Sequence, residues 1–110
     1  MRKLIIAVLF AVISIGNAHA QDKNSFWLGA DISGTTQLES NGEKLYNAKG
    51  EIRENTALMK ELGLNAVRLR VWVNPRGGWS GAEDVLEMAK RAKYYDMAVM
   101  IDFHYSDWWA

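Results

Sequence analysis

The chain has 110 residues, in which 13 lysines and arginines balance 13 aspartates and glutamates, and it contains no cysteine. The lack of cysteine excludes disulfides, thiol catalysis and thiolate-bound metals within this sequence. A formal net charge of zero without a basic run offers no electrostatic footprint for nucleic acid, and none for an anionic membrane surface.

The first 20 residues have the layout of a secretory signal peptide. Two basic residues precede an apolar run from residue 4 to residue 15, and Ala18-His19-Ala20 is an A-x-A cleavage site. The run is shorter than the roughly 20 residues that span a bilayer, which argues against a membrane anchor. We expect cleavage between Ala20 and Gln21, and a secreted or periplasmic protein without a membrane attachment after cleavage.

A polar lead-in at residues 21–26 is followed by a predicted strand at 27–32. Gly29, Asp31 and Ser33 share one face, because side chains alternate along a strand. Residues 33–50 are rich in Gly, Ser, Thr, Asn and Glu, and this composition predicts one long loop. Loops of that length inside compact domains are usually functional or disordered, and the apolar residues within this one favour order.

Residues 51–62 show the apolar spacing of a helix. Its stripe consists of Ile52, Leu58, Met59 and Leu62. We expect Gly63 to end this helix in the left-handed conformation, with Leu64 folding back on the last turn.

Residues 65–73 alternate with a strict period of two, which predicts a strand. The apolar face carries Val67, Leu69, Val71 and Val73. The opposite face carries Arg68, Arg70 and Trp72. Pro75 ends the strand, because proline cannot donate to a ladder.

A second helix and a third strand complete the chain. Ser80-Gly81-Ala82-Glu83 predicts a capping box that opens the helix, and Asp96 ends it. Its inner positions are Val85, Leu86, Met88, Ala89, Ala92 and Tyr95. The apolar run that begins at residue 98 is typical of a strand buried on both faces, and Asp102 and His104 interrupt it on one face.

The alternation of strands and helices, without a hairpin signal, predicts a parallel sheet of the α/β class. Both an open doubly wound sheet and a (β/α)₈ barrel fit this order. No glycine fingerprint follows the first strand, as a nucleotide-binding sheet would require. Each strand also has one charged face, which an open sheet covered by helices could not accommodate. The charges converge on one interior only in a barrel, near its C-terminal mouth, so we favour the barrel.

The charged positions are Asp31, Arg68, Arg70, Asp102 and His104. Buried charges must be paired, so ion pairs between them are expected in any case. Each of these residues has a structural and a functional interpretation. The structural interpretation is an ion network for the arginines and Asp102, a hydrogen-bonded core position for His104, and a turn or cap for Asp107. The functional interpretation is that they form a site.

Tryptophans gather at the same end of the predicted strands. Trp72, Trp79, Trp108 and Trp109 all lie at or just past strand C-termini. An indole offers a flat apolar face and one donor, which suit the C–H face of a sugar ring and its hydroxyl rim. Core packing explains Trp72 equally well. Together with the export signal, these residues indicate an extracellular glycan ligand.

Three stretches then resemble a known family. They are GADIS at 29–33, LGLNAVRLRVWVNP at 62–75, and IDFHYSD at 101–107 with Trp109-Ala110. They resemble the N-terminal part of glycoside hydrolase family 53, the arabinogalactan endo-β-1,4-galactanases that cut the galactan side chains of pectin. The resemblance covers about residues 27–110.

This resemblance implies a (β/α)₈ TIM barrel, of which this chain holds about the first three strands and two helices. It also implies a retaining mechanism with two glutamates, near the ends of the fourth and seventh strands. We therefore expect no catalytic residue in this chain, and no activity from it alone. The implied partner is a polysaccharide, with no metal or cofactor in this stretch and calcium only in a loop beyond it.

Residue by residue, Arg68 resembles the second-strand arginine that hydrogen-bonds the nucleophile and keeps it ionised. His104 resembles the third-strand histidine that lines the subsite at the cleavage point. The substrate-binding candidates are Asp31, Arg70, Trp72, Asp102, Asp107 and Trp109. A non-catalytic secreted glycan-binding protein on a degenerate barrel remains the alternative.

Overall fold

A computed structural model describes residues 26–105; the predicted signal peptide, Asp107 and Trp109 lie outside them. The elements are, in order, β1 (Gly29–Asp31), α1 (Thr35–Ser40), β2 (Leu45–Tyr46), β3 (Ile52–Arg53), α2 (Asn55–Glu61), β4 (Ala66–Val71), the 3₁₀ turn η1 (Arg76–Gly78), α3 (Ala82–Tyr94) and β5 (Ala98–Phe103). No helix among the described residues has the length and apolar character needed to span a bilayer.

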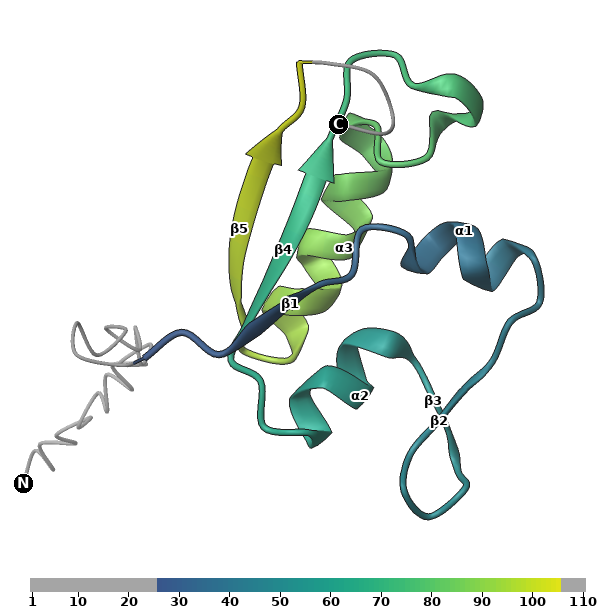
Figure 1. Ribbon diagram of the computed structural model, residues 1–110, viewed down its shortest axis with the longest axis vertical. Coiled ribbons are helices and arrows are strands. Elements are labelled where there is room, and N and C mark those ends of the chain that lie inside the picture. Colours follow the sequence, from purple (N-terminus) through teal and green to yellow (C-terminus); the bar gives the residue numbers. More distant parts are fainter. Residues whose placement is uncertain (1–25, 106–110) are drawn as a thin grey trace, which may run out of the picture.

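The principal sheet contains β1, β4 and β5 in that order, and both of its strand pairs are parallel. Arg68 lies opposite Asp31 on β1, and Arg70 lies opposite Asp102 on β5. Figure 1 shows the three arrows running in the same direction, with α3 lying along the β4–β5 pair. The parallel arrangement predicted from the alternating elements is therefore confirmed.

The core lies between this sheet and α3. Val67 and Leu69 on β4 are almost completely buried, and they pack with Met88 and Ala92 of the helix. Because side chains alternate along β4, the burial of these two apolar residues places Arg68 on the opposite face of the sheet. That opposite face is called the inner face below.

The helices α2 and α3 end as the sequence predicts. Gly63 has φ +92°, and the Leu64 N–H donates to the Met59 carbonyl, which is a Schellman arrangement. Asp96 takes the same left-handed position after α3, with φ +53°, and the Met97 N–H donates to the Ala92 carbonyl. Each helix thus turns directly into the strand that follows it.

Residues 33–50 are not a single loop, which corrects that prediction. They contain α1 and the strand β2, which pairs with β3 in an antiparallel hairpin. The buried Asn47 stabilises the hairpin turn, because its amide oxygen accepts the N–H groups of Lys49 and Glu51. This side chain takes the place of backbone partners, which is how asparagine replaces a regular turn.

The predicted helix 51–62 begins four residues later than expected. Ile52 and Arg53 form β3, so their backbone groups pair with β2 instead of starting a helix. Glu54 is the N-cap, and its carboxylate accepts the Ala57 N–H at 3.0 Å. Of the predicted stripe, Leu58 is buried and Met59 packs on the core, whereas Ile52 and Leu62 are exposed.

The start of α3 also differs from the predicted capping box. Gly81 is the N-cap and makes no side-chain cap. Asp84, the third helical residue, accepts the Ser80 N–H at 2.6 Å, so it has the role predicted for Glu83. On the inner side of the helix, Leu86 is exposed, while the other predicted positions are buried or packed on the core.

The strand β5 is exposed on both faces, contrary to the burial predicted from its apolar run. Met100, Ile101 and Phe103 are all exposed. The reason is that β5 pairs with a single strand, β4, among residues 26–105. Its apolar sequence is nevertheless that of a strand with neighbours and layers on every side, as in a closed parallel barrel.

Gly29 allows the close approach of β1 to β4. A Cβ atom at this position would lie 2.8 Å from the Ala66 carbonyl oxygen, closer than side-chain carbons approach backbone oxygens. The oxygen belongs to the paired strand and cannot swing away. Any side chain at this position must therefore push the two strands apart.

We predict that Gly29→Ala destabilises the fold by about 1–3 kcal/mol, the usual cost of overpacking. Gly34→Ala is the matched control, because a Cβ there meets no atom within 4 Å and the backbone φ is −85°. Thermal unfolding of the two variants in the full-length protein is the measurement. Equal melting temperatures for both variants would show that β1 and β4 separate without cost.

Candidate active-site face

Arg68 stands at the centre of the inner face and joins all three strands. Its Nη1 donates to Asp31 Oδ2 on β1 at 2.6 Å, and its Nη2 pairs with Asp102 Oδ2 on β5. The strand register places Asp31 directly opposite Arg68, and Asp102 two residues beyond the β5 position that pairs with Arg68. A single guanidinium therefore bridges two carboxylates that are 71 residues apart in the chain, as the two contacts span 37 and 34 residues.

A second group of contacts continues from Asp102 toward the C-terminal ends of the strands. His104 Nε2 lies 2.9 Å from Asp102 Oδ2, and its ring packs against Trp72 with centroids 4.8 Å apart. The Arg70 guanidinium lies 5.4 Å from the Trp72 ring centroid, within the range of a cation–π contact. Arg70 Nε also lies 3.2 Å from Asp31 Oδ2. The structure thus brings the predicted charged residues and Trp72 into one cluster.

Both aspartates of this cluster are held as carboxylates. Burial raises the pKa of Asp31, but the hydrogen bonds from Ser33 and the charges of Arg70 and Arg68 outweigh it, so the pKa lies below its ordinary value. The pKa of Asp102 is also lowered, because the contacts with His104 and Arg68 outweigh its desolvation. The side chains of Asp31, Arg68 and Asp102 are 27%, 42% and 30% exposed, so the cluster remains accessible to a ligand.

The hydrogen-bond partner of His104, Asp102, determines which ring nitrogen carries the proton. An ionised carboxylate only accepts hydrogen bonds, so the ring nitrogen that faces Asp102 must carry the hydrogen. We assign the Nε2–H tautomer on this basis, with Nδ1 left as an acceptor when the ring is neutral. The His104 side chain is 13% exposed, so its orientation is set by Asp102 and Trp72 together.

An aromatic hollow adjoins the cluster at the C-terminal ends of β4 and β5. Its aromatic lining consists of Trp72, Phe103, His104 and Tyr105, and Pro75 and Glu83 complete another wall. The sequence pattern led us to expect Trp72 and His104 here but not Phe103 or Tyr105. Phe103 and Tyr105 are the sequence neighbours of His104, and this position beside a candidate residue could have identified them. Trp79 does not line this hollow; its indole lies beside Gly77 in η1.

The sequence analysis did not name Ser33 as a candidate site residue. This serine is buried just beyond β1. Its Oγ donates to Asp31 Oδ1 at 2.5 Å and accepts the Arg70 N–H at 2.8 Å. The signal that could have found it is a serine two residues after a strand aspartate, a spacing at which side chain and backbone N–H both reach the carboxylate.

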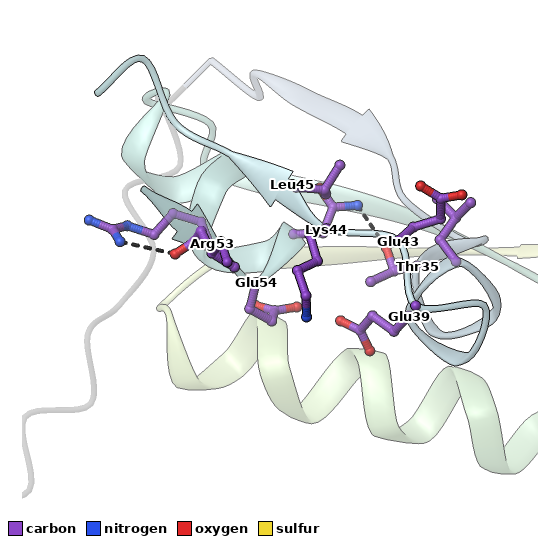
Figure 2. A pocket seen from close by; sticks show the side chains of 11 residues that line it. Thr35, Glu39, Glu43, Lys44, Leu45, Arg53 and Glu54 are labelled. Carbon is purple, nitrogen blue, oxygen red and sulfur yellow. Dashed lines mark hydrogen bonds between the residues drawn. The ribbon is translucent and has the colours of Figure 1, made fainter. Parts of the chain in front are cut away.

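A separate hollow lies between α1, the β2–β3 hairpin and the start of α2, and it shares no lining residue with the cluster. Figure 2 shows Lys44 pointing between Glu39 and Glu54 in this hollow. Both glutamates are also paired with Arg91 of α3, at 2.8 and 3.2 Å. These ion pairs tie α1 and α2 to α3, so the carboxylates are engaged in joining helices.

Within residues 26–105, no group of three or more histidine, cysteine or acidic side chains is arranged to hold a metal ion. The acids of the inner face are engaged by arginine and histidine. Asp107 and Trp109, the other predicted substrate-binding residues, lie outside the described part of the chain.

Comparisons with known proteins agree on one family. A sequence model described as glycosyl hydrolase family 53 matches residues 27–110. An endo-β-1,4-galactanase of Bacillus subtilis is 38% identical over 77% of this chain and 22% of its own length. An arabinogalactan endo-β-1,4-galactanase of Cellvibrio japonicus is 34% identical over 98% of this chain and 29% of its own length.

Solved structures give the same result for the fold. A chain from a study of two fungal β-1,4-galactanases superposes with a TM-score of 0.72 and 37% identity, over 76% of this chain and 25% of that one. The family 53 catalytic domain of Ignisphaera aggregans superposes with a TM-score of 0.70 and 38% identity, over 77% and 26%. The chain thus spans about a quarter of the length of these relatives. Its three parallel strands with their helices form part of a (β/α)₈ barrel.

The lowered pKa of Asp31 gives a prediction about acid stability. A carboxylate whose pKa is lower in the folded state stabilises the protein above its unfolded pKa, and this contribution is lost as the pH falls through the folded value. We therefore predict that Asp31→Asn lowers the melting temperature of the full-length protein by about 2–4 °C at pH 7, and that the gap from wild type narrows below about pH 4.

The matched control is Glu43→Gln, since Glu43 is exposed and makes no ion pair with another described residue. Its melting temperature should follow wild type at every pH. A constant gap between Asp31→Asn and wild type from pH 7 to pH 3 would contradict the assigned role of the carboxylate.

Proposed function

The chain belongs to glycosyl hydrolase family 53, and from that premise we propose that its protein is an endo-acting hydrolase of β-1,4-galactan. The substrate class is the galactan side chains of pectic arabinogalactan. The observation that carries this proposal is the inner face, where Arg68 and its carboxylates adjoin an aromatic hollow at the C-terminal ends of the strands. Catalytic sites of such barrels lie at this end. Secretion or export to the periplasm would bring the protein to a polymer that cannot enter the cell.

The proposed chemistry retains the anomeric configuration and uses two glutamates. Retention requires two carboxyl groups about 5–5.5 Å apart, of which one is protonated and donates to the leaving oxygen. Asp31 and Asp102 do not suit that role, because Arg68 binds both and their lowered pKa keeps them ionised. Following the pattern of the family, we propose that both catalytic glutamates lie on strands outside this chain, which alone would release no sugar.

Arg68 suits the support of such a nucleophile. A guanidinium has five N–H donors, and the contacts with Asp31 and Asp102 use two of its nitrogens. The remaining donors are available to a carboxylate that another strand of the barrel directs toward the same interior. A glutamate in contact with this cation would stay ionised and ready to attack the anomeric carbon.

His104 and Trp72 suit substrate contact at the same point. The Nε2–H group of His104 points to Asp102, so the ring has a defined orientation. Its Nδ1 can then accept a hydrogen bond from a sugar hydroxyl. Trp72 is held between His104 and Arg70 and presents an indole to the hollow. An apolar ring face and oriented polar groups are the usual elements of a carbohydrate site.

We predict that the full-length protein releases reducing ends from β-1,4-galactan and leaves β-1,4-mannan and cellulose largely intact. Proton NMR of the first products should show the β anomer, because the mechanism retains configuration. Binding of galactan without release of reducing ends would favour the non-catalytic glycan-binding alternative. Equal rates on the three polymers would contradict the substrate assignment.

We predict that Arg68→Ala lowers the kcat of the full-length enzyme about 100-fold or more with little change in KM, because the interaction acts on the reacting carboxylate. Removing this arginine also takes one cationic partner from both Asp31 and Asp102, so Arg68→Lys, which keeps the charge, is measured alongside to separate folding from catalysis. Arg76→Ala is the control, as Arg76 is an exposed arginine of η1. A normal kcat in folded Arg68→Ala would leave a structural role only.

A further inference from the structure

We propose that Ser33 is a positioning residue for the hydrolase reaction, because it orients Asp31 and thereby holds the Arg68 guanidinium in place at the centre of the inner face. This inference rests on the proposed function of the protein as a galactanase. Ser33 is buried and does not line the aromatic hollow beside the cluster. We therefore expect its effect on the reaction to pass through its contacts with Asp31.

The direction of the Ser33 hydroxyl proton follows from its two partners. The Arg70 backbone N–H can only donate, so Ser33 Oγ is the acceptor of that 2.8 Å bond. The single hydroxyl proton is then left for Asp31 Oδ1, at 2.5 Å. The arrangement has no alternative proton placement that satisfies both partners while Asp31 is ionised.

The two oxygens of Asp31 are divided between different tasks. Oδ1 accepts both the hydroxyl and the backbone N–H of Ser33, at 2.5 and 3.0 Å. Oδ2 faces Arg68 Nη1 at 2.6 Å and Arg70 Nε at 3.2 Å. Because Ser33 occupies one oxygen, the carboxylate cannot rotate about its terminal bond without breaking a short hydrogen bond. The oxygen that binds Arg68 is thereby kept in a fixed place.

Ser33 has no helix-capping role that would account for its hydroxyl. The N-cap of α1 is Gly34, which has no side-chain cap. The next buried hydroxyl along the chain, Thr35, provides a contrast: its Oγ1 donates to the Ile32 carbonyl at 2.7 Å and accepts from Asn55 at 2.8 Å. Thr35 thus makes two buried hydrogen bonds without touching the charged cluster.

This contrast supplies the experiment, in which Ser33→Ala and Thr35→Val are compared in the full-length enzyme on β-1,4-galactan. Both variants lose a buried hydroxyl, so both should lower the melting temperature. Only Ser33→Ala should lower kcat, by about tenfold or more, the equivalent of one hydrogen bond to a charged group, with KM within about twofold of wild type. Thr35→Val should keep the wild-type kcat.

Two further variants keep the test decisive if Ser33→Ala folds poorly. Ser33→Thr retains the hydroxyl and should restore kcat, whereas Ser33→Cys is similar in size but a weak donor, so its kcat should lie below that of Ser33→Thr. Equal kcat values for the folded Thr and Cys variants, or a wild-type kcat in Ser33→Ala, would overturn the inference. Wild-type enzyme in the same assay separates the two proposals, since a wild type without activity on galactan refutes the proposed function and this role with it.

Discussion

The pairing of Arg68 with carboxylates from both neighbouring strands is the interaction on which the inner face depends. A half-buried guanidinium is costly unless it is paired. Asp31 of β1 lies directly opposite Arg68, and Asp102 of β5 reaches it diagonally from two residues further along the strand. The same two contacts that satisfy the charge also connect β4 to both neighbouring strands. The structural interpretation of the charged cluster is therefore compatible with the role in the reaction that we propose for Arg68.

The segment between β1 and α2 contributes to this face from outside it. Thr35 of α1 accepts a hydrogen bond from Asn55 of α2, and Arg91 of α3 pairs with Glu39 and Glu54. These contacts join the outer helices to one another, and Ser33 lies directly before α1. The side chain of Ser33 returns to the sheet, where it accepts the Arg70 N–H. Ser33 in this way reaches the charged cluster from this segment, whereas Thr35 does not touch it.

The family assignment and the geometry support different parts of the functional proposal. The relatives are named galactanases, and these names support the substrate class that we propose. The geometry concerns the acids of the inner face: Asp31 and Asp102 bind cations and their pKa values are lowered, so neither suits the part of proton donor in the retaining mechanism that we propose. Had the aspartates been unpaired in an apolar pocket, they would have been candidates for the catalytic acid.

Much of this arrangement could be predicted from the sequence, because it depends on local periodicity. The two-residue alternation of Val67, Arg68 and Leu69 determined which side chains enter the core and which form the charged face, and the left-handed ends at Gly63 and Asp96 follow from the chain itself. Tertiary structure decided the β2–β3 hairpin, the exchange of Glu83 for Asp84 at the start of α3, and the bond from Arg70 to Ser33. The last of these joins residues 37 apart, and such a contact depends on strand register and helix packing. A local pattern carries no information about which distant backbone N–H will face a given hydroxyl, so only the assembled sheet could show that Ser33 binds the Arg70 N–H, whereas its contact with Asp31 is local.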